Sequence, residues 1–350
     1  MPVWASDATI ANTDEAHGAI ISNAIALQYR IVAETLGRTD FPSTVTLWEE
    51  GAALYCGGHL HLPADAGVIF ADVGTAQMLE EPLFTAPKRQ KQGIYYHVGY
   101  IGWGPHLAEG CCDEKQVYNY RTAADHSCTW YSILNVSNLR ELHMGARLNA
   151  AILQNPGDFD LEQYRTETLG RLYGEFAAEL IALRRDYFAA IADLGETDAV
   201  AYNTKSHTHF LHEYGTLPFA QHIVSDGVAA ALGKRWLKGI DVLDADLPRR
   251  MAESQRQFSA LYDRICAVEP QVPSHLAAHF ALFPKLQTHY MAQLLTWNLA
   301  CRRKDREEAL KALKAILQAR EIACQGPWQG WYNGEKKIGI RRLLSLTEAL

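Results

Sequence analysis

Three short segments before residue 140 place polar side chains directly after apolar runs, and their residue types suit carbohydrate chemistry. GVIFADVG carries Asp72, GIYYHVGY holds His97 between tyrosines, and ILNVSN ends on asparagines. A carboxylate delivered by a buried strand can act as a general acid or base. Aromatic rings stack on the apolar faces of sugars, while polar side chains hydrogen-bond the hydroxyls. The segments therefore predict a carbohydrate-directed site in which Asp72 is a catalytic carboxylate.

Several residues of these segments are expected to bind the substrate. Alternation along a strand places Tyr95 and His97 on the face opposite Tyr96. The adjoining loop GYIGWGPHL is rich in glycine, and polar or aromatic loop residues on a rigid scaffold are often functional. A structural alternative stays open for each segment, because aspartates cap turns, histidines can be buried in cores and asparagines close turns. The expected substrate-binding residues are Tyr96, His97, Tyr100, Trp103, His106, Asn135 and Asn138.

The elements that must position these residues form a pattern typical of a parallel sheet. Apolar runs predict strands in GVIFADVG and over residues 94–100 and 130–136, and residues 107–125 have turn and helix character. Helices are predicted over residues 15–36 and 43–55. Strand, helix and strand in alternation imply right-handed crossovers, and sites form at the carboxyl ends of parallel strands. The polar strand ends are therefore expected to lie together.

After Pro156 the strand signals disappear and helical periodicity takes over. One helix is predicted to run for about 30 residues from Asp160, and others cover residues 249–268, 275–303 and 305–323. Long helices with short connections favour an antiparallel bundle. The chain is therefore expected to be an α/β protein with a parallel β/α domain over residues 1–155 and an α-helical domain over residues 156–350.

Composition restricts the partners of the chain. Its 350 residues are 48% apolar, enough for a core, and the net charge of -7 argues against a nucleic-acid-binding surface, which needs clustered Lys and Arg. No apolar run reaches the roughly 20 residues of a membrane span, and the N-terminus lacks a signal peptide. The number of cysteines, seven, is odd, and five of them are scattered singly among apolar neighbours, as is typical of reduced thiols. We expect a cytoplasmic protein without nucleic-acid or membrane partners, and a homo-oligomer stays open.

Metal and cofactor motifs are weak in this sequence. Histidines gather in HLHL (His59, His61) and in HTHFLH (His207, His209, His212), and Cys111 is adjacent to Cys112. These spacings match neither H-E-x-x-H nor C-x2-C, and the sequence contains no P-loop, G-x-G-x-x-G or G-x-S-x-G motif. We therefore expect no metal and no cofactor. A metal-dependent hydrolase that uses the histidine clusters is the weaker alternative.

The order of the segments resembles the central part of glycoside hydrolase family 115, the alpha-glucuronidases that remove glucuronic acid or its 4-O-methyl form from xylan side chains. The likeness covers roughly residues 1–155. It rests on VTLWEEGAALYCGGHLHLP, GVIFADVG, GIYYHVGYIGWGPH and ILNVSNL. The tyrosine, tyrosine and histidine run with its following proline and histidine is the most specific of the four stretches.

The resemblance implies a TIM-type barrel. The chain begins where the family's barrel is already half built, so we expect either a fragment of a longer protein or a divergent relative that closes its sheet differently, with a partner chain as one way to do so. The resemblance also implies an inverting hydrolysis of an oligosaccharide or sugar-acid substrate, for which paired carboxyl groups lie about 6.5–9.5 Å apart. Asp72 would then be a catalytic or water-positioning carboxylate, and Asp7 the acidic residue of an earlier strand. His97 and Tyr100 would bind the sugar acid.

Three positions depart from the family motifs. Val73 stands in place of an aspartate, Gly74 in place of an asparagine, and Asn138 in place of another aspartate. The lost acidic residues favour a second hypothesis, a non-catalytic carbohydrate-binding or scaffold protein. Binding of a sugar without turnover would distinguish this hypothesis from a hydrolase.

Overall fold

The computed structural model describes residues 13–72, 77–79, 81–99, 105, 107, 109, 111–191, 216–233, 246–335 and 338–349. The chain divides into two compact units. Unit 1 comprises residues 1–97, 116–135 and 152–159, and unit 2 comprises residues 98–115, 136–151 and 160–350. The units are interleaved along the chain, so the boundary predicted at residue 155 lies inside the last segment of unit 1.

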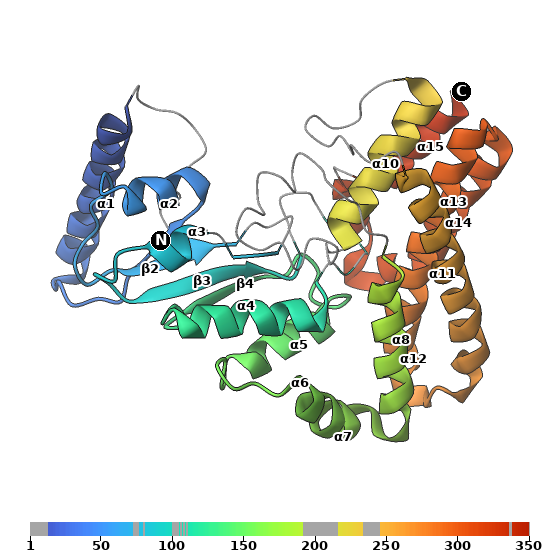
Figure 1. Cartoon of the computed structure of the whole chain (residues 1–350), viewed down its shortest axis with the longest axis horizontal. Coiled ribbons are helices and arrows are strands. Elements are labelled where there is room, and N and C mark those ends of the chain that lie inside the picture. Colours follow the sequence, from blue (N-terminus) through green and yellow to red (C-terminus); the bar gives the residue numbers. More distant parts are fainter. Residues whose placement is uncertain are drawn as a thin grey trace. The chain divides into compact units, whose positions relative to one another are not determined.

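Unit 1 is built on a sheet of four parallel strands in the order β1-β2-β3-β4 (Figure 1). Strand β2 is buried along its whole length, which explains its uninterrupted apolar run. The predicted parallel sheet is confirmed, and an open four-stranded sheet with connecting helices is consistent with part of a β/α barrel. The strands are β1 (Thr44–Leu47), β2 (Gly67–Ala71), β3 (Gln92–His97) and β4 (Ser132–Asn135), and the helices are α1 (Asp14–Leu36), α2 (Glu49–Cys56), α3 (Glu81–Thr85) and most of α4 (Asp113–Asp125).

Close backbone packing near the start of β3 sets its alignment with β4. A Cβ atom added to Gly93 would lie 2.2 Å from the carbonyl oxygen of Tyr131, so only glycine allows this approach. The resulting register pairs Ile94 with Ser132 and His97 with Asn135. The two strands therefore end level with each other, on a histidine and an asparagine.

The helix predicted over residues 43–55 is wrong in its first half. Residues Thr44–Leu47 form β1, and α2 begins only at Glu49. Val45 pairs with Val68 of β2, and this parallel pairing overrides the helix preference of the neighbouring leucine and alanine residues. The correction matters for function, because it creates a fourth strand end at the carboxyl edge of the sheet.

Unit 2 is mostly helical, which confirms the prediction for the second half of the chain. Helix α13 lies at its centre and packs against α10, α11 and α14, and its Trp297 is almost completely buried. No helix in the described ranges is both long and apolar enough to cross a membrane. The main helices are α5 (His143–Ile152), α8 (Ala177–Ala189), α10 (Thr216–Leu232), α11 (Leu247–Val268), α13 (Gln287–Arg303), α14 (Arg306–Arg320) and α15 (Ile340–Glu348).

Two of the predicted long helices are interrupted. The helix predicted from Asp160 consists of α6 (Leu161–Gln163), a π-helical turn, α7 (Gly170–Tyr173) and α8, with Gly174 at φ 57° ending α7. The helix predicted over residues 275–303 consists of α12 (Ala277–Phe280) and α13. Phe283 between them is extended, because a residue that precedes proline avoids the helical conformation.

Candidate active site

Polar and aromatic residues follow all four strands of unit 1 at the carboxyl edge of the sheet. Trp48 follows β1 and Asp72 follows β2, while β3 and β4 end on His97 and Asn135. The backbone N–H of Asp72 donates to the carbonyl oxygen of Tyr95 at 2.9 Å, which continues the pairing of β2 with β3. The three predicted strand-end residues Asp72, His97 and Asn135 are thus brought to one edge.

Asp72 and His97 form a buried pair. Oδ2 of Asp72 accepts a hydrogen bond of 2.9 Å from the backbone N–H of His97, and Oδ1 contacts Nδ1 of the imidazole. Both side chains are completely buried. Because a carboxylate only accepts, Nδ1 carries the proton, and any second hydrogen bond of the ring must use Nε2. The arrangement holds the imidazole in one tautomer and one orientation.

Two aromatic rings flank this imidazole. The His97 ring centroid lies 4.5 Å from that of Tyr95 and 5.3 Å from that of Trp48, which meets it edge-on. Nδ2 of Asn135 donates to the Tyr95 hydroxyl at 2.7 Å. Burial raises the pKa of Tyr95, so its hydroxyl keeps its proton. Tyr95 and His97 share a face of the sheet, as the alternation predicts.

The structure differs from the prediction for Tyr96, which is a core residue. Its side chain is fully buried, its hydroxyl donates to the carbonyl oxygen of Gln77 at 3.0 Å, and its ring packs 5.5 Å from that of Tyr120. These contacts lie on the opposite face of β3 from His97. Tyr96 therefore stabilises the packing of unit 1, and these contacts favour the structural alternative for this residue over the predicted contact with a sugar.

Asn138 also differs from its prediction. Strand β4 ends at Asn135, and Asn138 belongs to unit 2, where it is buried. Its Oδ1 accepts from the Ser137 hydroxyl at 2.8 Å, and its Nδ2 donates to the Tyr332 hydroxyl at 3.3 Å. These contacts are internal to unit 2. Asn138 is thus a packing residue and not a strand-end ligand.

Other predicted residues lie outside the described part of the chain. This applies to Asp7, Tyr100, Trp103 and His106, and to the histidines of HTHFLH. In HLHL, His61 is exposed, and Nδ1 of His59 lies 3.8 Å from a carboxylate oxygen of Glu15. Among the described residues, no group of three or more His, Cys, Asp or Glu side chains is arranged to hold a metal ion.

Glu49 and Trp48 were not predicted as site residues. Glu49 follows β1 by two positions, is exposed, and has φ 33°, in the left-handed region that a glutamate rarely adopts. Such strain costs about 1–3 kcal/mol and concentrates at functional sites. The signal for both residues was the alternating, β-branched run TVTL, which marks a strand that ends just before them.

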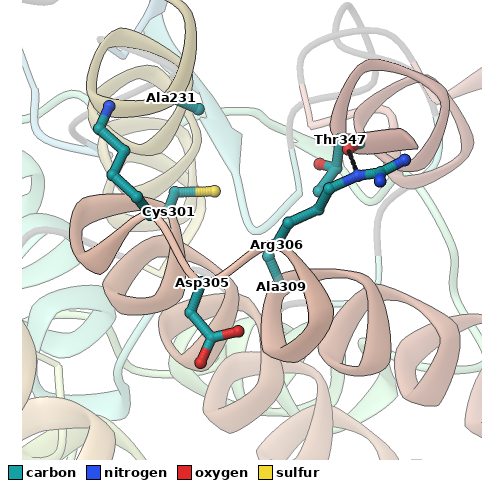
Figure 2. Close-up of a pocket in the computed structure, with 7 residues that line it drawn as sticks. Ala231, Cys301, Asp305, Arg306, Ala309 and Thr347 are labelled. Carbon is teal, nitrogen blue, oxygen red and sulfur yellow. Dashed lines mark hydrogen bonds between the residues drawn. The ribbon is translucent and has the colours of Figure 1, made fainter. Parts of the chain in front are cut away.

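Neither of two cavities in the described part of the chain is lined by the residues at the carboxyl ends of the strands. One, of about 480 Å³, lies between α1 and β1 in unit 1, with Ile25, Val32, Phe41 and Val45 among its lining residues. The other, of about 220 Å³, lies among helices of unit 2 (Figure 2). There the side chain of Arg306 donates to the backbone of Thr347 at 3.3 Å, so a polar group of this cavity holds α15 in place. The carboxyl edge of the sheet is therefore the candidate active site.

Comparison with known proteins assigns the chain to a family. The model of glycosyl hydrolase family 115 matches residues 5–194. A solved structure, a family GH115 4-O-methyl-alpha-glucuronidase with specificity for decorated arabinogalactans, is similar in fold, with a TM-score of 0.64 at 16% sequence identity. The match covers 95% of this chain and 42% of that protein, so the chain spans less than half of its length. No match was found among curated proteins. Because the family model spans more than half of the 350 residues, the chain belongs to glycosyl hydrolase family 115.

Proposed function

We propose that the carboxyl edge of the sheet is part of an alpha-glucuronidase-type site that removes uronic-acid side chains from a glycan. The observation that carries this proposal is the buried Asp72–His97 pair between the rings of Trp48 and Tyr95. Family membership supports a carbohydrate substrate, and the similar solved structure is a 4-O-methyl-alpha-glucuronidase. Rings beside an oriented imidazole suit a sugar acid, which offers both an apolar face and polar oxygens.

Each residue of the edge has a proposed role. His97 binds a sugar oxygen through Nε2, and Asp72 is a positioning residue, because both of its oxygens contact His97. Trp48 and Tyr95 pack against the sugar, and Asn135 orients the Tyr95 hydroxyl. The exposed carboxylate of Glu49 is the general acid or base, a role for which Asp72 is less suited because both of its oxygens contact His97.

An assay of released sugar tests this function. The full chain is incubated with xylan oligosaccharides and arabinogalactan that carry 4-O-methylglucuronic acid, and the free acid is followed by proton NMR. Inversion predicts that the β-anomer forms first from the α-linked substrate, because a water attacks from the opposite face of the ring. Release of the α-anomer first would contradict the inverting mechanism, and no release from any of these glycans would contradict the hydrolase.

Substitutions of Glu49 are expected to lower the activity without lowering the stability of the fold. Glu49→Gln removes the proposed acid or base and should lower kcat by about 100-fold or more. Glu49→Gly removes both the carboxylate and the backbone strain, so it should be equally inactive but more stable by about 1 kcal/mol in chemical unfolding. Glu50→Gln, which changes the neighbouring exposed glutamate, is the matched control and should keep wild-type activity. Full activity of Glu49→Gln would exclude this role for the carboxylate.

A non-catalytic sugar-binding function is the second candidate. It is supported by the complete engagement of the Asp72 carboxylate with His97 and by Val73 and Gly74, which stand where the family motif has acidic and amide groups. Calorimetric titration with glucuronic acid and with the same oligosaccharides, run beside the product assay, distinguishes the two functions. Binding without release of product would favour the second.

A further inference from the structure

Two histidines and a tyrosine from three helices converge within unit 2. His143 is the first residue of α5, Tyr173 the last of α7, and His279 lies in α12 (Figure 1). The Tyr173 hydroxyl lies 3.5 Å from Nε2 of His143 and 3.4 Å from Nε2 of His279. The two imidazole centroids are 4.3 Å apart. The Tyr173 hydroxyl thus meets a ring nitrogen of each of two neighbouring histidines, and the three residues come from three separate elements.

The tautomer of His143 follows from its other contact. Nδ1 lies 3.1 Å from the carbonyl oxygen of Arg140, and a carbonyl can only accept, so Nδ1 carries the proton. The lone pair of Nε2 therefore points at the Tyr173 hydroxyl. Metal-binding histidines are commonly oriented in this way, with the second ring nitrogen donating to a backbone carbonyl.

The two distances from the Tyr173 hydroxyl fit shared coordination of a metal ion better than a pair of hydrogen bonds. An O–H to N hydrogen bond is normally near 2.8 Å, and the single proton of Tyr173 can serve only one of the two nitrogens. In a tetrahedral site with bonds near 2.0–2.1 Å, neighbouring ligand atoms lie about 3.3–3.4 Å apart. The observed 3.4 and 3.5 Å match that separation.

The site lies near Arg184, whose charge acts on both imidazoles. The charge of Arg184 is balanced by Glu109 and Asp113, with which it forms buried ion pairs. Tyr173 is buried, whereas both histidines are only half-buried, so an ion from solution can reach them.

We propose that His143, Tyr173 and His279 form a binding site for a divalent transition-metal ion of the Zn²⁺ type. Two imidazole nitrogens favour Zn²⁺, Co²⁺, Ni²⁺ or Cu²⁺ over Mg²⁺ and Ca²⁺, which prefer oxygen ligands. The Tyr173 oxygen is the third ligand, and its proton passes to the solvent when the ion binds. Such an ion would link α5, α7 and α12 within unit 2.

Titration of the chelator-treated full chain with Zn²⁺ tests the site by calorimetry, and titration with Co²⁺ tests it by visible absorption. The wild type should bind one ion at this site. His143→Gln and His279→Gln should each weaken that binding by more than about 100-fold. His275→Gln, an exposed histidine one turn before His279, is the matched control and should bind like the wild type. Absence of binding to the wild type, or equal binding by His143→Gln and His279→Gln, would overturn the proposal.

Two further variants keep the test decisive if the histidine variants do not fold. Tyr173→Phe keeps the ring that stacks on His279 and should weaken Zn²⁺ binding by about tenfold and change the Co²⁺ spectrum, because one ligand is lost. Arg147→Gln removes a positive charge that acts on His143 and should tighten binding by about two- to fivefold. Unchanged affinity in both variants would place any bound ion elsewhere.

Discussion

Replacing Asp72 with asparagine is expected to lower the rate of sugar release by about 10³-fold or more, with the fold retained. The amide oxygen of asparagine can still accept the hydrogen bond from the backbone N–H of His97, now made by Oδ2 at 2.9 Å. The amide nitrogen then faces Nδ1, so the proton of the imidazole must move to Nε2. The ring nitrogen proposed to meet the sugar changes from an acceptor to a donor.

The measurement is kcat and KM for release of 4-O-methylglucuronic acid, with the melting temperature measured in parallel. Asp65→Asn is the matched control, since Asp65 is an exposed carboxylate of the same unit just before β2, and it should keep wild-type kinetics. Asparagine has almost the volume of aspartate, so only a modest loss of stability is expected. Wild-type kcat in Asp72→Asn would show that the orientation of His97 by Asp72 has no part in the reaction.

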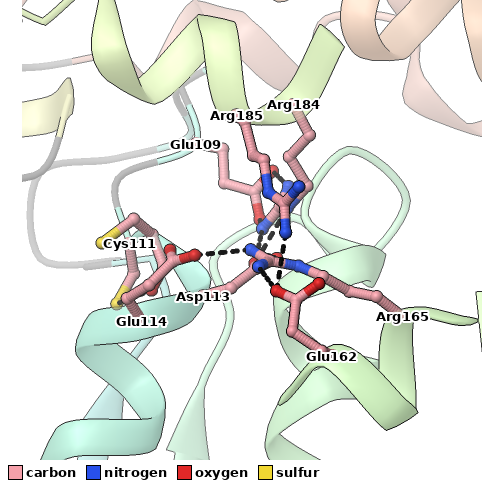
Figure 3. Close-up of polar contacts among 9 residues, drawn as sticks. Glu109, Cys111, Asp113, Glu114, Glu162, Arg165, Arg184 and Arg185 are labelled. Carbon is pink, nitrogen blue, oxygen red and sulfur yellow. Dashed lines mark hydrogen bonds and ion pairs between the residues drawn. The ribbon is translucent and has the colours of Figure 1, made fainter. Parts of the chain in front are cut away.

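Replacing Arg184 with methionine is expected to lower the free energy of unfolding by about 3–5 kcal/mol, because the buried carboxylate of Glu109 would lose its cation and that of Asp113 one of its two. Arg184 donates to both carboxylate oxygens of Glu109, at 2.5 and 2.8 Å, and to Oδ1 of Asp113 at 2.9 Å (Figure 3). Arg165 donates to the other oxygen of Asp113 at 3.0 Å, so Asp113 keeps one arginine partner after the substitution. Glu109 loses both of its hydrogen bonds from Arg184.

The next residue in the chain provides the control for this effect. Arg185 is about half exposed and pairs with the exposed Glu162, so Arg185→Met should cost less than about 1 kcal/mol. Both variants replace an arginine of α8 with methionine. The replaced arginines differ in burial, because Arg184 is buried and Arg185 is half exposed. Urea unfolding at neutral pH measures the difference. Equal stabilities of the two variants would mean that the buried pairs contribute little to unit 2.

The local sequence was sufficient to predict those elements whose residue pattern matches their burial in the folded chain. Strand β2 is an apolar run because both of its faces are buried, and α14 begins directly after Asp305, whose side chain accepts a hydrogen bond from the backbone N–H of Glu308 at 3.0 Å. Prediction failed where a longer-range contact decided the conformation. Leucine and alanine suggested a helix over residues 43–55, but pairing with β2 made Thr44–Leu47 a strand.

For the candidate site, the residue types and the strand ends could be identified from the sequence, and so could the shared face of Tyr95 and His97, since alternation is a local property of strands. The contact partner of each side chain could not be identified from the sequence. That Asp72 contacts the imidazole of His97, whereas Tyr96 packs in the core, depends on the register of β2 with β3 and on α4, which brings Tyr120 against the sheet.

The sequence by itself determined the parallel β/α character of the first part, the helical character of the second, and the polar carboxyl ends of β2, β3 and β4. Periodicity and apolar runs express these features, because they depend on which side of an element is buried. Only the tertiary structure decided that Asp72 orients His97, that Glu49 has a left-handed backbone, and that His143, Tyr173 and His279 meet. Such contacts join residues far apart in the chain, and their geometry is set by packing that no short stretch of sequence contains.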